Sequence, residues 1–106
     1  WRIWGAVGYD MWTEAAVWAH IALDSPVALR RLLPALFEYP FVQCGRRLML
    51  ATIAGDNLAS LSLAQRLGME VEHIIPGGWS WGVPLVMLRL ERSRCRYLPA
   101  EARLAA

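Results

Sequence analysis

The chain has 106 residues, of which 57% are hydrophobic and 19% charged, and its formal net charge is +2 at pH 7. These values predict one compact globular domain and exclude a disordered tail or a multidomain enzyme. No apolar run of membrane-spanning length and no basic-then-apolar leader are present, so we expect a soluble cytoplasmic protein without a membrane partner. The first residue is Trp1 rather than Met, so we expect a chain that begins inside a longer gene product or has been trimmed.

The apolar fraction of this sequence, 57%, is above the average of soluble domains, which is about 45–50%. Six tryptophans add to it, and large aromatic side chains are common in interfaces as well as in cores. We therefore expect a homo-oligomer or another protein partner.

All eleven basic residues are arginines, a bias that reflects a GC-rich genome more often than a phosphate-binding surface. Cys44 and Cys95 are far apart and lack the ligand spacing of a metal site, so we expect reduced thiols and no metal. One local arginine cluster is too small to favour nucleic acid as a partner, and we expect its side chains to be solvated. It comprises Arg89, Arg92, Arg94 and Arg96, interleaved with Glu91.

Two strands are predicted first, over residues 2–12 and 14–24, and their closeness favours a hairpin. The second strand alternates apolar and more polar positions, the period of a half-buried strand. Its apolar face would carry Ala15, Val17, Ala19, Ile21 and Leu23. Its more polar face would carry Glu14, Trp18, His20 and Asp24.

A helix is then expected from the capping sequence at 24–26, with a kink at Pro34 and an end between Pro40 and Gly45. Residues 47–53 are apolar on both faces, which predicts a buried central strand. A second helix follows, with Asn57 as its N-cap and Gly68 as its stop.

The remaining segments, near residues 69–75 and 83–92, predict two strands joined by a turn-rich loop. The order is thus β-β-α-β-α-β-β, which predicts an α+β fold with one mixed sheet. Residues 1–98 would form the single domain, and residues 99–106 a frayed tail.

The segment from Asn57 to Met69, Asn-x-x-Ser ending in Leu-Gly-Met, resembles the GNAT-type N-acetyltransferase superfamily. Further similarity lies in FEYPF at 37–41, in the Gly-x-x-x-Val-Met-Leu run at 82–88 and in CRYL at 95–98, which resemble a GNAT-like branch found in phages and prophages. The resemblance covers nearly the whole chain. It corresponds to the C-terminal part of that fold and lacks the first strand and two helices.

This resemblance implies acetyl-coenzyme A (acetyl-CoA) in a wedge between residues 15–24 and 47–53, where the peptide groups of splayed strands can bond the pantetheine arm. Asn57 and Ser60 would face that arm. A helix N-terminus would hold the pyrophosphate. The backbone contacts would come from Ala22, Leu23 and Asp24 and from the first turn, Val27 to Arg30.

Two positions depart from the family pattern. The segment SPVALRRLL at 25–33 has no glycine-rich phosphate cradle, although Arg30 or Arg31 could compensate. Many members use a tyrosine in the last helix to protonate the leaving thiolate, and the matching residue here is Ala64.

His20 is the first candidate base, because an imidazole suits proton removal and the residue lies on the more polar face of the splayed strand. Glu14 on the same face is the second. The alternatives are a structural histidine and a solvated carboxylate. Glu70, Glu72 and His73 alternate along one strand, where plain cross-strand surface pairs are the preferred interpretation.

Two functions from different classes remain open. The first is an acetyl-CoA-dependent N-acetyltransferase with an amine acceptor that the sequence does not identify. The second is a catalytically silent GNAT-like scaffold that oligomerises or serves a phage-associated structural role. Binding of nucleic acid through the arginine cluster is a third, less favoured hypothesis.

Overall fold

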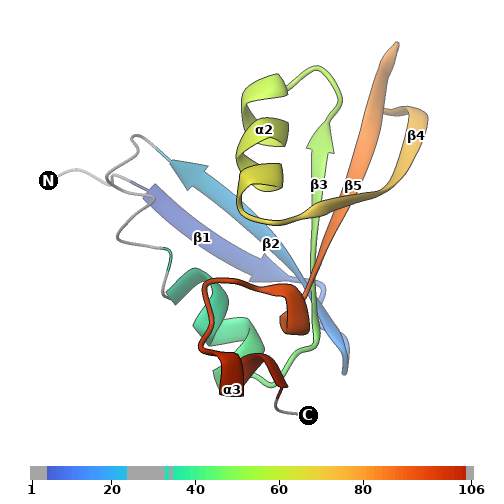
Figure 1. Ribbon diagram of the computed structural model, residues 1–106. Helices are drawn as coiled ribbons and strands as arrows, with labels where there is room; N and C mark the ends of the chain where they lie inside the picture. The colour runs from blue at the N-terminus through green and yellow to red at the C-terminus, as the bar shows by residue number, and fades with distance from the viewer. Residues whose placement is uncertain (1–4, 24–32, 34, 105–106) are drawn as a thin grey trace, which may run out of the picture.

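The computed structural model describes residues 5–23, 33 and 35–104, and its centre is a five-stranded mixed sheet in the order β1-β2-β3-β5-β4 (Figure 1). Adjacent strands are antiparallel except for β2 and β3, which are parallel. The predicted α+β class is therefore confirmed. The strands are β1 (Gly5–Asp10), β2 (Ala16–Leu23), β3 (Leu48–Ala54), β4 (Glu70–Ser80) and β5 (Val83–Glu91).

Two α-helices with defined bounds accompany the sheet, α2 (Leu58–Arg66) and α3 (Ala100–Leu104). Short helical turns lie at Tyr39–Gln43 (η1) and Arg92–Arg94 (η2). Within the described part of the chain, no helix has the length and apolar character needed to cross a membrane.

The helical side chains pack on one face of the sheet. Ala19 of β2, Met49 of β3 and Leu88 of β5 join Phe37 and Leu67 in one buried cluster. Because side chains alternate along a strand, the neighbouring positions point to the opposite face, which we call the Trp18 face. The register places Asp10, Trp18, His20, Leu50 and Arg89 on it.

The first helical segment continues through Pro40 and ends at Gln43, within the predicted interval from Pro40 to Gly45. Residues 33 and 35–38 are helical, and the turn continues as the π-helix η1 with Pro40 at its start. A proline lacks the N–H that would bond the carbonyl four residues earlier, which belongs to Leu36. The hydroxyl of Tyr9 on β1 donates to that carbonyl at 2.8 Å. Tyr9 thus satisfies the buried acceptor that the proline leaves free.

Three details of the structure differ from what the sequence predicts. β2 begins at Ala16, so Glu14 and Ala15 precede the strand and both are exposed. β3 is central but only Met49 and Ala54 are fully buried, because its other side chains reach the Trp18 face or the edge of the core. The expected tail contains α3, whose Ala102 packs against the core.

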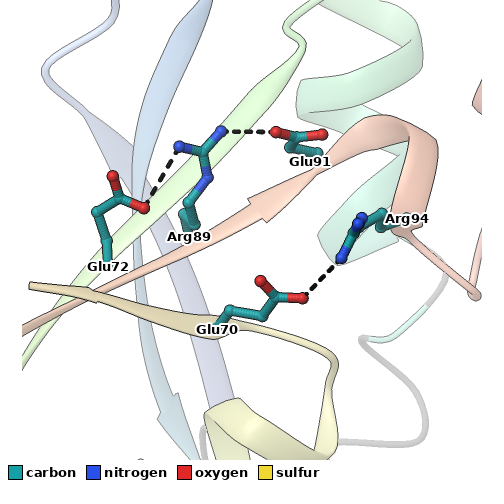
Figure 2. Close-up of polar contacts among 5 residues, drawn as sticks. All are labelled: Glu70, Glu72, Arg89, Glu91 and Arg94. Atoms are coloured by element: carbon teal, nitrogen blue, oxygen red, sulfur yellow. Dashed lines mark hydrogen bonds and ion pairs between the residues drawn. The ribbon is translucent and has the colours of Figure 1, made fainter.

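The arginine cluster is engaged within the chain and is not simply solvated. Arg92 is buried, and its Nε donates to the carbonyl of Ala102 at 2.6 Å, which holds α3 against the end of β5. Arg89 pairs with Glu72 and Glu91, and Arg94 pairs with Glu70 (Figure 2). Arg96 donates to the carbonyl of Arg66 and lies over the ring of Tyr97. The cross-strand surface pair expected for Glu72 is therefore present, whereas Glu70 pairs with a residue of η2.

Candidate functional site

The main functional feature is a separation of the two parallel strands. β2 and β3 share three register pairs, Ala16 with Leu48, Val17 with Met49, and Trp18 with Leu50. Beyond these pairs the two strands diverge, while β2 stays paired with β1 as far as Leu23 and β3 with β5 as far as Ala54. The arrowheads of β2 and β3 point apart in Figure 1. The mutually facing edges of Ala19–Leu23 and Ala51–Ala54 are left without a strand partner.

A pocket of about 210 Å³ occupies this region, and we call it the slot. Its walls come from the diverging end of β3, from one side of α2, from His20 of β2 and from Trp79 of β4. Most of the lining is apolar, and the polar side chains are few. The lining residues are His20, Ala51, Thr52, Ile53, Ala54, Asn57, Ser60, Leu63, Ala64, Leu67, Met69 and Trp79.

Polar groups of the slot gather at the first turn of α2. Asn57 is the N-cap, and its Oδ1 accepts a hydrogen bond from the backbone N–H of Ser60 at 3.2 Å. This bond satisfies one of the free N–H groups at the helix start. Because Asn57 and Ser60 also line the slot, the side-chain amide donor of Asn57 and the hydroxyl of Ser60 are placed beside any molecule bound there.

Gly68 ends the same helix as predicted. It has a φ of 101°, and the N–H of Met69 donates to the carbonyl of Ala64 at 3.0 Å, which closes the last turn. Ala64 is 7% exposed and lines the slot. The position where the family pattern has a phenol hydroxyl therefore offers only a methyl group to the slot.

The two candidate bases occupy different parts of the molecule. His20 lines the slot and forms a side-chain hydrogen bond with Asp10, with 2.9 Å between Nε2 and Oδ1. Glu14 precedes β2, whereas the slot opens toward the other end of that strand. Glu14 lies in a bend before the strand, six residues from His20, so at most roughly 20 Å of chain separates the two. Glu14 is not among the described residues that line the slot, and its role as a base stays a prediction.

Only some of the residues expected to contact the cofactor through their backbone lie in the part of the chain that the structure describes. Ala22 and Leu23 end β2, paired with Ala6 and Gly5 of β1, so their other edge faces away from β1. Asp24, Val27 and Arg30 lie outside the described residues.

Sequence reasoning missed two residues, Trp79, which lines the slot, and Asp10, which contacts the slot residue His20. Trp79, 54% exposed, comes from the far end of β4, which the sequence predicts as a loop. Asp10 was predicted only as part of a strand, and the antiparallel register of β1 with β2 is what brings it to His20. The sequence alone does not give the register of this hairpin, and with that register the contact between Asp10 and His20 could have been predicted.

The comparisons with solved structures concern the fold. A mixed sheet whose parallel strands β2 and β3 part beside a capped helix is GNAT-like, and solved acetyltransferases of that family superimpose on it. No protein-family model matches the chain, and no curated protein is detectably similar in sequence.

Three solved structures illustrate the similarity. One is yncA from Salmonella typhimurium, described as an acetyltransferase and solved with its cofactor acetyl-CoA; its TM-score is 0.70 at 22% identity, covering 82% of this chain and 57% of that one. A GNAT-family acetyltransferase from Bacillus anthracis matches with a TM-score of 0.66 at 14% identity, over 82% of this chain and 57% of that chain. Mutant forms of the spermidine/spermine N-acetyltransferase SpeG from Vibrio cholerae match with a TM-score of 0.73 at 14% identity, over 87% and 59%. The chain thus spans less than two thirds of these proteins.

Proposed function

We propose that this protein is an acetyl-CoA-dependent N-acetyltransferase that transfers the acetyl group to an amine acceptor. The observation that carries the proposal is the separation of β2 and β3 after three register pairs. A packing scaffold would gain stability by continuing this ladder, because each unpaired peptide group removed from water costs free energy. The open edges are therefore best explained by a ligand that supplies the missing bonds.

The residues of the slot fit a pantetheine arm. That arm carries two amide groups on an otherwise apolar chain, so it can bond exposed strand edges as another strand would. Ala19–Leu23 and Ala51–Ala54 supply such edges, and the apolar lining suits the methylene groups between the amides. Asn57 and Ser60 add side-chain donors at the start of α2. Ala22, Leu23, Asp24, Val27 and Arg30 are proposed as further contacts of the cofactor.

His20 is proposed as the base. When the amine nitrogen attacks the thioester carbonyl, the new C–N bond forms as the C–S bond breaks, and the imidazole takes the proton that the nitrogen loses. Coenzyme A leaves as a thiolate. Ala64 has no acidic proton to offer it, so the sulfur takes its proton from water or keeps the charge. His20 suits this role because it lines the slot while its side chain is 54% exposed, so that an acceptor can reach it.

Calorimetric titration with acetyl-CoA tests the proposal directly. We expect the wild type to bind, and Ser60→Trp to weaken binding at least about tenfold, which corresponds to roughly 1.4 kcal/mol. The indole would occupy the slot that Ser60 lines. Ser62→Trp is the matched control, because Ser62 lies on the same helix, is exposed and does not line the slot.

The outcomes separate binding in the slot from binding elsewhere. Absence of binding by the wild type at near-millimolar acetyl-CoA would exclude the proposed function. Equal weakening by the two tryptophan variants would show that the ligand does not enter the slot.

A further inference from the structure

The pair formed by Asp10 and His20 lies where β2 leaves β3. His20 is two residues beyond Trp18, the last residue of β2 that pairs with β3. Both side chains belong to the Trp18 face, opposite to the face on which α2 packs. The imidazole is 54% exposed and the carboxylate 59% exposed. The pair is thus accessible from the side of the sheet opposite to α2.

The register of the β1–β2 hairpin makes this contact. Trp18 is the partner of Asp10 across the two strands, and Gly8 is the partner of His20. Asp10 and His20 are therefore diagonal neighbours on one face, a separation that longer side chains can bridge. Gly8 has no side chain, and a Cβ built there would meet nothing within 4 Å. Open space is left beside the imidazole, where an acceptor could approach.

The contact determines which nitrogen of His20 is available. Nε2 lies 2.9 Å from Oδ1 of Asp10. A carboxylate accepts hydrogen bonds and does not donate them, so the neutral imidazole keeps its proton on Nε2 when this bond forms. Nδ1 is then the nitrogen with a free lone pair. The carboxylate also stabilises the imidazolium once Nδ1 has accepted a proton.

Among the described residues, the cation that the strand register brings onto this face is held by other partners. Arg89 is the nearest cation by register, since Trp18 pairs with Leu50 and Leu50 with Arg89. Its guanidinium is held by Glu72 at 3.4 Å and Glu91 at 2.7 Å, as Figure 2 shows. Apart from His20, none of the described residues that line the slot has an ionisable side chain.

We propose that Asp10 is a positioning residue for His20, holding the imidazole so that Nδ1 accepts the proton of the acceptor amine. This inference rests on the proposed acetyl transfer and adds a residue to its machinery. We expect the Asp10 side chain to have no effect on the affinity for acetyl-CoA, because Asp10 does not line the slot. Its removal should therefore lower kcat and not the affinity for the cofactor.

Nuclear magnetic resonance tests the positioning without reference to activity. The chain contains two histidines, His20 and His73, so the imidazole nitrogen signals of the whole protein can be assigned to two rings. At alkaline pH we expect the Nε2–H form to be more fully populated in His20 than in His73, whose partner across the strands is Met87. Asp10→Ala should remove this difference. An unchanged His20 spectrum in Asp10→Ala would overturn the proposal.

Kinetics tests the consequence. Release of the coenzyme A thiol from acetyl-CoA is followed with spermidine as the amine probe and with water as the basal acceptor. Asp10→Ala should lower kcat by about 10- to 100-fold, by analogy with carboxylates that orient metal-ligating histidines, whose loss costs activity by that factor. Asp10→Asn should recover part of the loss, because the amide oxygen still accepts from Nε2. The matched control is Glu101→Ala, an exposed carboxylate on α3, which should leave kcat unchanged.

The two proposals fail in different ways. Normal binding of acetyl-CoA with an unchanged kcat in Asp10→Ala overturns the role of Asp10 and leaves the proposed function intact. Failure of the wild type to bind acetyl-CoA, or to release thiol with either acceptor, overturns both. Urea midpoints for every variant identify any loss of activity that results from unfolding.

Discussion

The bond from Tyr9 to Leu36 allows a quantitative test of how the first helical segment is attached to the sheet. Leu36 is 1% exposed, and Pro40 cannot supply the N–H that an uninterrupted helix would offer to the Leu36 carbonyl. The Tyr9 hydroxyl donates to that carbonyl at 2.8 Å. Tyr9→Phe removes this donor and keeps the ring, which packs against Trp12 and Tyr39.

The expected loss follows from leaving a buried acceptor unpaired, which costs about 1–3 kcal/mol. Because Tyr9 is only half-buried and water can reach part of the site, we expect the lower half of that range, about 1–2 kcal/mol. In a domain of this size each kcal/mol lowers Tm by roughly 4–8 °C. Urea denaturation followed by tryptophan fluorescence measures the change in the free energy of unfolding.

A double-mutant cycle tests the proposed reason. Pro40→Ala restores an N–H four residues after Leu36, so this amide can replace the Tyr9 hydroxyl as donor to the same carbonyl. Tyr9→Phe should then cost about 0.5–1 kcal/mol less in the Pro40→Ala background than in the wild type. If Tyr9→Phe costs the same in both backgrounds, the explanation through the orphaned carbonyl is wrong.

Three further predictions concern the same sheet and the slot. Burial raises the pKa of Tyr9 from 10.0 to about 12. The Tyr9 hydroxyl therefore contributes its full stabilisation below pH 10, and this stabilisation is lost as the pH rises toward 12. Over that interval the wild type should lose more stability than Tyr9→Phe. Asn57→Ala should cost about 1 kcal/mol through the lost cap while Asn57→Ser costs little, and a similar loss of acetyl-CoA affinity in both variants would indicate a ligand contact in addition to the cap. Gly55→Ala should destabilise the protein by about 1–3 kcal/mol, because its Cβ would overlap the ring of Pro84. Gly8→Ala, with open space around its Cβ, should cost less. Equal costs, measured by thermal unfolding, would argue against the close approach at Gly55.

The α2 helix shows how much can be predicted from local sequence. Its N-cap at Asn57 and its stop at Gly68 were both predicted, and both are present in the structure. Caps and stops act through hydrogen bonds between residues a few positions apart, so the information lies within one short segment. The same holds for the strands, whose alternating or continuous apolar patterns predicted the mixed sheet.

Register and sheet order depend on contacts between distant segments, and the sequence did not reveal them. The place where β2 and β3 separate, the meeting of Asp10 with His20 and the burial of Arg92 under α3 all belong to this group. Glu14 illustrates the limit, since a shared alternation pattern assigned it to the face of His20 although the strand begins only at Ala16.

The sequence by itself therefore determined which segments form helices and strands, and it indicated an acetyltransferase-like arrangement around Asn57 and Ser60. Only the tertiary structure decided which side chains share the slot. The physical reason is that periodicity and capping are local interactions, whereas a slot between two strands exists only once each strand has found its partner on the other side.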